Sequence, residues 1–332
     1  MCAIAGLLFK HDLSRNFNMT TGEALTEILD ATLHRGPDSA GWALYKEPLK
    51  KDNLIRMRFL LTEKPLAQIQ KQEEVEAESK VEREIKKIRK QLESLNVTVI
   101  DEAVIGCTLS VHASYKGDIL HLTRSFEKEM LPISIGESLD IIKDVGHPRE
   151  LARKYSINNF NGSHGIAHIR LATESGVRPD TAHPFWACGF SDIATVHNGQ
   201  ITNYWIMRRR LERKGMAFQT HNDTELIAVY LAYQMSVGAD LEDALKASLD
   251  DLDGTFSYLV ATKDSIGYAK DKLAAKPMVK YENDEMIVIS SEEVGINRLF
   301  PGKALETNEP APLSYGFWRR NLHQIKDKKG DA

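Results

Sequence analysis

The first chemistry that this sequence offers lies at Cys2, directly after the start methionine. A thiol with an ordinary pKa of about 8.5 becomes a strong nucleophile once a base removes its proton. If Met1 is removed, the α-amine of Cys2, whose ordinary pKa is about 7.7–8.0, can take that proton through one water. One residue then supplies both nucleophile and base, as in N-terminal threonine nucleophiles. The alternative is a cysteine without a chemical role.

Cys2 belongs to the first of six short stretches that occur in a fixed order up to about residue 225. They are MCAIAG at 1–6, HRGPDSAG at 34–41, HIRLAT at 168–173, AHP at 182–184, HNG at 197–199 and NDTE at 222–225. Together they resemble the class II glutamine amidotransferases, N-terminal-nucleophile enzymes that hydrolyse glutamine and pass the ammonia to a partner. One tripeptide would be weak support, whereas six ordered stretches are a specific signature.

Within this class, the sequence most specifically resembles the stand-alone amidotransferase subunit of glutamate synthase-like and N-methylglutamate synthase complexes. That subset has Ala-Thr-Glu-Ser, here at 172–175, and its similarity to this chain extends through 162–300. One departure is Ala3, where the class usually has glycine. The resemblance implies a partner with FMN and iron–sulfur clusters. This chain itself is expected to bind neither cofactor, because it lacks the cysteine clusters that would ligate iron.

The resemblance also implies a role for individual residues. Asn198, through its side-chain amide, and Gly199, through its backbone N–H, would hold the oxyanion that forms when Cys2 attacks the glutamine carboxamide. Arg170 would bind the α-carboxylate of glutamine as a bidentate fork. Asp223 would pair with its α-ammonium. These two charges would leave the carboxamide free to reach the thiol.

Three further residues complete the implied site. Thr173 would supplement Arg170, and His183 would join the substrate-binding residues. Arg35 would lie beside the nucleophile, where a cation favours the thiolate. No metal is expected, since His112, His121 and His147 lack close partners at metal-ligand spacing.

Each of these residues also has a plain structural interpretation. Asn198-Gly199 is a common hairpin turn, Asp223 suits the N-cap or first turn of a helix, and Arg170 could be a surface charge. Two other functions therefore remain open. The protein could hydrolyse a different amide, so that replacing Arg170 or Asp223 leaves turnover intact. It could also be a catalytically silent interaction subunit, in which case Cys2→Ala changes nothing.

The composition fits these functions and disfavours others. The chain has 332 residues, of which 42% are hydrophobic and 27% charged, as in soluble globular proteins. The net charge of −4 argues against nonspecific electrostatic binding to nucleic acid or to an anionic membrane surface. No apolar stretch has the length of a membrane span, and no secretory leader is evident. The three widely spaced cysteines predict reduced thiols in the cytoplasm.

The elements that must position the site can be read from apolar spacing. The apolar run 3–9 predicts a buried strand that anchors Cys2. Segment 68–95 predicts a charged helix with one apolar stripe, packed on the body or, as an alternative, docking a partner. Other expected helices are 20–33, 137–155 (one helix or a pair), 203–214, a helix from 221 and 241–252. Other expected strands are 41–45, two within 97–114, 165–173, 192–196, 255–262, 266–270, 278–281 and 286–290.

The fold implied by the resemblance is α+β, the four-layer α/β/β/α sandwich of N-terminal-nucleophile hydrolases with two mainly antiparallel sheets. The pattern of short strands and amphipathic helices agrees with it. We expect one domain over 2–305, with a family-divergent insertion at about 46–160, and a polar, irregular tail over 306–332. Because no second catalytic domain is evident, the chain should be a stand-alone glutaminase subunit whose ammonia another polypeptide uses.

Overall fold

Strand β1 (Ala3–Phe9) directly follows Cys2 and is buried along its whole length inside a six-stranded antiparallel sheet. Its apolar side chains point to both faces, so it carries no polar alternation. This confirms the strand expected over 3–9. The structure is a computed structural model that describes residues 2–11, 17–47, 53–62, 74–126, 130–171 and 177–320.

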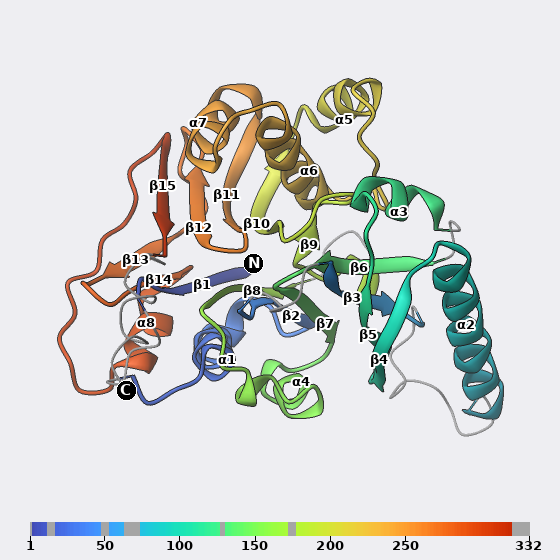
Figure 1. Ribbon diagram of the computed structural model, residues 1–332. Coiled ribbons are helices and arrows are strands. Elements are labelled where there is room, and N and C mark those ends of the chain that lie inside the picture. Colours follow the sequence, from blue (N-terminus) through green and yellow to red (C-terminus); the bar gives the residue numbers. More distant parts are fainter. Residues whose placement is uncertain are drawn as a thin grey trace, which may run out of the picture.

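Two antiparallel sheets form the centre of the molecule (Figure 1). The six-stranded sheet has the order β13 (Val279–Glu282), β14 (Met286–Ser290), β1, β8 (His164–Arg170), β2 (Ser39–Tyr45), β7 (Leu139–Val145). The five-stranded sheet has the order β15 (Ser314–Arg319), β12 (Ser265–Lys270), β11 (Gly254–Ala261), β10 (Ala194–Ile201), β9 (Phe185–Trp186). Strands β1 and β8 of the first sheet face β10, β11 and β12 of the second.

Helices cover the outer face of each sheet. The six-stranded sheet is covered by α1 (Thr21–Ala31), α4 (Pro148–Lys154) and α8 (Glu293–Leu299). The five-stranded sheet is covered by α6 (Asp223–Ser236) and α7 (Leu241–Asp251), with α5 (Tyr204–Arg213) beside α6. The four-layer α/β/β/α sandwich expected from the sequence is therefore confirmed.

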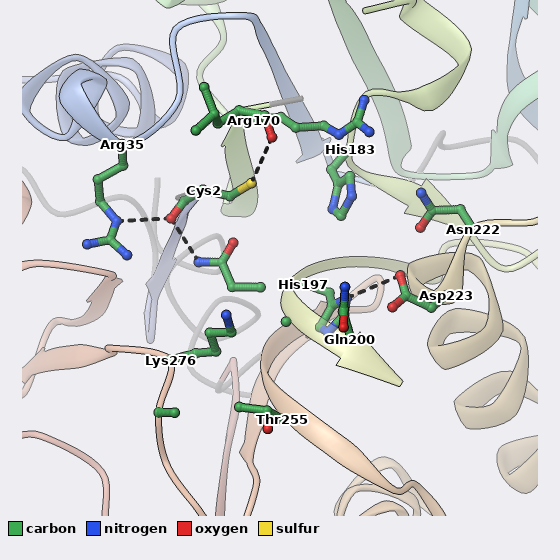
Figure 2. A pocket seen from close by; sticks show the side chains of 14 residues that line it. Cys2, Arg35, Arg170, His183, His197, Gln200, Asn222, Asp223, Thr255 and Lys276 are labelled. Carbon is green, nitrogen blue, oxygen red and sulfur yellow. Dashed lines mark hydrogen bonds and ion pairs between the residues drawn. The ribbon is translucent and has the colours of Figure 1, made fainter. Parts of the chain in front are cut away.

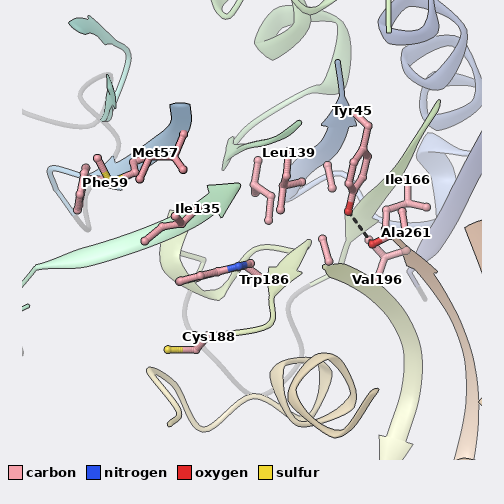
Figure 3. Close-up of a cluster of buried hydrophobic side chains, with 14 of the residues drawn as sticks. Tyr45, Met57, Phe59, Ile135, Leu139, Ile166, Trp186, Cys188, Val196 and Ala261 are labelled. Carbon is pink, nitrogen blue, oxygen red and sulfur yellow. Dashed lines mark hydrogen bonds between the residues drawn. The ribbon is translucent and has the colours of Figure 1, made fainter. Parts of the chain in front are cut away.

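The space between the two sheets is an apolar core. Ile4 and Leu8 of β1 pack there with Leu259 and Ile266 of the other sheet. The core continues toward the third sheet described below, and Figure 3 shows this continuation around Tyr45 and Trp186. The Tyr45 hydroxyl donates to the carbonyl oxygen of Ala261 at 2.6 Å and so ties the two sheets together.

The segment between β2 and β7 builds a third, four-stranded antiparallel sheet. Its order is β4 (Thr98–Ile105), β5 (Thr108–Ser114), β3 (Leu54–Leu60), β6 (Leu131–Gly136), and α3 (Ile119–Ser125) follows β5. Helix α2 (Glu74–Ser94) buries Ile88 and Leu92 of its apolar stripe in the core that includes this sheet. The two strands within 97–114 and the packed helix are confirmed, while residues 68–73 of the expected helix lie outside the described ranges.

Two expectations about elements are wrong. Residues 139–145 form strand β7 and not a helix, and only Pro148–Lys154 of the segment 137–155 is α-helical. The charged residues of β7 pair with residues distant in sequence, as Asp140 does with Arg58 at 2.7 Å, and the local pattern does not show these partners. The chain after Glu306 is not irregular throughout, since Ser314–Arg319 pairs with β12 as β15.

Candidate active site

A cavity of about 480 Å³ lies at the start of β1, between the two sheets and the first turn of α6 (Figure 2). Its lining comes from segments far apart in the sequence. The lining residues are Cys2, Arg35, Arg170, Leu171, His183, His197, Asn198, Gly199, Gln200, Asn222, Asp223, Thr255, Ala275 and Lys276. Seven of the eight residues expected in the site are among them. The eighth, Thr173, lies outside the described residues.

Cys2 is held firmly although it precedes the first strand. Its carbonyl oxygen accepts hydrogen bonds from Arg35 Nε at 2.9 Å and from Asn198 Nδ2 at 3.2 Å. Two residues later, the Ile4 N–H donates to Ser291 Oγ at 2.9 Å. The half-buried thiol faces the cavity, and its Sγ lies 3.9 Å from the carbonyl oxygen of Leu171. The backbone of Cys2 is thus anchored, while its thiol stays accessible from the cavity. Met1 lies outside the described residues.

Arg35 brings a buried positive charge next to Cys2. It ends the 3-10 turn that follows α1, and its guanidinium pairs with the carboxylate of Glu292. Partial burial would raise the pKa of Glu292, but hydrogen bonds from Arg35 and His34 outweigh it and lower that pKa. Glu292 therefore stays ionised and fixes the arginine. The printed contact of the guanidinium is with the backbone carbonyl of Cys2, and the role of Arg35 in favouring the thiolate stays a prediction.

Asn198 and Gly199 lie inside β10, opposite Ser257 and Phe256 of β11, so the hairpin-turn alternative is wrong. The Asn198 amide donates to Cys2 and also lies 3.3 Å from Ser291 Oγ. Gly199 has a φ of +130°, and a Cβ there would lie 1.9 Å from the carbonyl oxygen of Thr255. Only glycine fits this backbone.

Arg170 and Asp223 bring opposite charges to the same cavity. Arg170 ends β8, and its Nη1 donates to Thr181 Oγ1 at 3.1 Å. Asp223 opens α6 as a first-turn acid, while the neighbouring Asn222 caps the helix. In Figure 2 the Arg170 guanidinium and the Asp223 carboxylate both lie to the right of the Cys2 sulfur. The cavity is therefore lined by a positive and a negative side chain.

The Asp223 carboxylate is kept ionised by its neighbours. Burial by itself would raise the pKa of Asp223. His197, whose Nδ1 lies 3.5 Å from Asp223 Oδ1, and the N–H of Ile201, which donates to Oδ2 at 3.1 Å, outweigh burial and lower that pKa. A negative charge therefore faces the cavity at neutral pH.

Two stacked histidines form one wall of the site. The rings of His168 and His183 lie 4.1 Å apart at 16°, and His183 lines the cavity. Burial, together with the nearby Arg170 guanidinium, lowers the pKa of His168 to about 3. Burial and the neighbouring imidazoles hold the pKa of His183 well below its usual value. Both rings are therefore neutral at pH 7 and add no charge to the site.

Sequence reasoning missed several lining residues. His197, Gln200 and Asn222 are direct neighbours of expected site residues, so adjacency in the motifs could have found them. Thr255 and Lys276 come from segments with no chemical signal of their own, and only the packing of β11 and of the loop between β12 and β13 brings them to the cavity. In the described ranges, no three His, Cys, Asp or Glu side chains are grouped to hold a metal ion, and no helix is long and apolar enough to cross a membrane.

Comparisons with known proteins point to one family. Residues 168–298 match the family described as glutamine amidotransferase domain. The chain is 36% identical over 313 residues to a putative glutamine amidotransferase of Methanothermobacter thermautotrophicus, covering 94% of this chain and 98% of that protein. It is 33% identical over 318 residues to the glutamine amidotransferase-like protein GlxB of Rhizobium meliloti, and this match covers 96% of this chain and 98% of that protein.

The fold has a counterpart among solved structures. The glutamine phosphoribosylpyrophosphate amidotransferase from B. subtilis matches with a TM-score of 0.56 at 17% identity. The match covers 96% of this chain and 49% of that one, so this chain spans about half the length of that enzyme. At this identity, the similarity concerns the fold alone.

Proposed function

Because this chain belongs to the class II glutamine amidotransferases, we propose that it hydrolyses L-glutamine with Cys2 as the N-terminal nucleophile. The observation that carries the proposal is the cavity itself. One space of about 480 Å³ is lined by a thiol, a guanidinium and a carboxylate, the three groups that a glutamine hydrolase of this kind needs. This convergence supports the proposed roles of Arg170 and Asp223 over a surface charge and a purely structural acid.

Binding rests on the charges of the free amino acid. Arg170 donates two hydrogen bonds to the α-carboxylate of glutamine, and Asp223 accepts hydrogen bonds from the α-ammonium. His183, a neutral imidazole, contributes to the same pocket without repelling the ammonium. The carboxamide at the other end of the substrate then extends toward the Cys2 thiol. An amide that lacks this zwitterion would offer neither side chain an opposite charge and would bind poorly.

The reaction starts once Met1 has been removed. The α-amine of Cys2 takes the thiol proton, and Sγ forms a bond with the carboxamide carbon of glutamine. Asn198 and the N–H of Gly199 stabilise the negative oxygen that develops. The C–N bond breaks, and ammonia leaves with the proton from the α-amine. Water then attacks the thioester, the C–S bond breaks, and glutamate and the free thiol are released.

The ammonia needs an acceptor that this cavity does not supply. We propose that a partner subunit resembling glutamate synthase, with FMN and iron–sulfur clusters of its own, consumes it in the cytoplasm. The relatives that this chain matches over nearly their whole length are named as glutamine amidotransferases, and a glutamine amidotransferase releases ammonia for a second reaction. Co-purification from native cells with a flavin-containing subunit would support it, and a chain that purifies alone would contradict it.

The test of the chemistry is mass spectrometry after incubation with a diazo-ketone analogue of glutamine. We expect loss of Met1 and a single adduct on Cys2, and no adduct on Cys2→Ala. Cys107 and Cys188 serve as internal controls, because burial raises the pKa of both thiols. A processed but unlabelled protein that releases no ammonia from glutamine would contradict the proposal and favour another amide. Retained Met1 without an adduct would favour a silent subunit.

A further inference from the structure

A buried lysine lies next to the site and plays no part in the proposed chemistry. Lys143 belongs to β7 at the edge of the six-stranded sheet and is only 3% exposed. It lies outside the segment 168–298 that matches the family model. An ammonium in such surroundings is costly unless its three N–H groups find acceptors.

All three acceptors come from one short segment of backbone. Lys143 Nζ donates to the carbonyl oxygens of Asp180 at 3.3 Å, Ala182 at 2.8 Å and Pro184 at 3.2 Å. It also lies 4.2 Å from the centre of the Phe185 ring, within the range of a cation–π contact. One side chain thus fixes the course of the chain over residues 180–184.

That segment carries two contacts of the candidate active site. Thr181 lies between the first two carbonyls, and its Oγ1 accepts from the Arg170 guanidinium at 3.1 Å. His183 lies between the last two, and its ring stacks on His168 and lines the cavity. The backbone is close-packed here, since a Cβ on Gly41 would lie 2.1 Å from the His183 carbonyl oxygen. A shift of the segment would therefore move both site residues together.

We propose that Lys143 is a positioning residue of the glutamine site: its ammonium holds segment 180–184 so that Thr181 orients Arg170 and His183 faces the substrate. The inference rests on the proposed function and adds a residue to it. Lys143 does not touch the substrate. Its effect should fall on glutamine binding more than on the chemical step, because the groups it positions are those that bind the amino-acid end of the substrate.

The ammonium is close to losing its proton. Burial lowers the pKa of Lys143 to about 8, against the opposing attraction of Asp180 and Glu225, while Arg170 lowers it further and Cys107 acts slightly in the other direction. The charged form, with three donors, is present below that pH. Above it, the amine keeps two N–H groups and no charge. Wild-type KM for glutamine should therefore rise above about pH 8.

The experiment compares wild type with Lys143→Met, which keeps the length of the side chain and removes its charge and donors. At pH 7 we expect KM for glutamine to rise at least 10-fold and kcat to change less than 3-fold. The rise of KM above pH 8 should be lost. Lys154→Met is the matched control, since Lys154 pairs with the buried Asp144 at 2.8 Å, and no hydrogen bond joins its side chain to segment 180–184 in the described part of the structure. The control should leave KM unchanged.

Hydrogen exchange gives a readout that does not depend on turnover. The amides of residues 181–183 should exchange faster in Lys143→Met than in wild type or Lys154→Met. Equal exchange, or an unchanged KM in a folded Lys143→Met protein whose Cys2 still takes the glutamine analogue, would overturn the positioning role and leave the proposed function intact. A wild type that neither hydrolyses glutamine nor takes the analogue would instead overturn the proposed function. If Lys143→Met does not fold, Lys143→Gln is measured in the same way.

Discussion

At Gly199, the backbone leaves no room for a side chain. We predict that Gly199→Ala lowers kcat by about 100- to 1,000-fold, as does the loss of one oxyanion donor in other enzymes. The reason is the position of the new Cβ, 1.9 Å from the Thr255 carbonyl oxygen, which forces β10 away from β11 and moves both Gly199 and Asn198. Steady-state kinetics with glutamine measure the effect.

The control for this substitution is Gly238→Ala. Gly238 also has a positive φ, +109°, but a Cβ there meets nothing within 4 Å. It therefore tests backbone strain without a clash near the site, and kcat should not change. An equal loss of kcat in both variants would mean that general destabilisation, and not the displaced oxyanion donors, explains the result.

At Arg170, a guanidinium and an ammonium should differ in how tightly they bind the carboxylate of glutamine. Arg170→Lys keeps the positive charge but loses the fork that can bind both oxygens of a carboxylate. We predict a rise in KM for glutamine of roughly 10- to 100-fold, the equivalent of one strong charge-assisted hydrogen bond. Initial rates over a range of glutamine concentrations measure it. Arg213→Lys on the exposed face of α5 is the control, and an unchanged KM in Arg170→Lys would contradict the assigned role.

Single residues differ in how far the sequence could identify them. Cys2, Arg170 and Asp223 were found because their motifs are specific and the chemistry needs those residue types. Lys143 could not be found, because a lysine between Ile142 and Asp144 looks like a solvated charge. Its burial depends on carbonyl groups some 40 residues away, with sequence separations of 37 to 41.

At the scale of elements, the expectations held where apolar spacing alone decides the structure. Strand β1 and helix α1 have such patterns. They failed at β7 and β15, where the local sequence has no clear strand pattern and pairing with a neighbouring strand determines the structure. β15 is an edge strand paired only with β12 within the described residues, and Trp318 donates from Nε1 to Glu282 at 2.8 Å. Such pairing is a property of the sheet and is not visible in the local sequence.

This pairing predicts the effect of truncation. A chain that ends at Leu313 lacks β15 and with it Tyr315 and Phe317, so it exposes the edge of β12 and the core side chains that these two aromatics cover. Its free energy of unfolding should fall by at least about 3 kcal/mol, the value for exposing one or two large apolar side chains. Urea titration followed by circular dichroism measures it. A chain that ends at Arg320 keeps the strand and is the control. Equal stability of the two truncated chains would show that β15 contributes nothing.

At the scale of the whole molecule, three buried neutral histidines make stability depend on pH. Burial lowers the pKa of His164 to about 4 and that of His168 to about 3, and the pKa of His183 also falls well below its usual value. In the unfolded chain these histidines have pKa values of about 6.5, so below that pH the unfolded state binds more protons than the folded state. Stability is therefore highest above pH 6.5 and is lost as the pH falls toward 4.

We predict that each of these histidines contributes up to about 1.4 kcal/mol of lost stability per pH unit in this window. Urea midpoints at pH 7, 6 and 5 measure the loss. His164→Gln, which is remote from the cavity lining, should make the dependence on pH less steep by one such contribution, while His121→Gln on the exposed face of α3 should leave it unchanged. A stability that is constant between pH 7 and 5 would contradict the burial of neutral imidazoles.

The three thiols differ in burial, and this difference determines which of them is oxidised first during storage in air. Peroxide attacks thiolates, and the raised pKa values of the buried Cys107 and Cys188 leave those two sulfurs protonated and shielded. Cys2 alone is accessible, beside the Arg35 cation. Oxidation should therefore begin there, giving first a sulfenic acid that reductants restore and then a sulfinic acid that they do not. With Cys2 as the proposed nucleophile, a stored preparation would lose its turnover while its fold stays intact, and a reductant added early would preserve the activity.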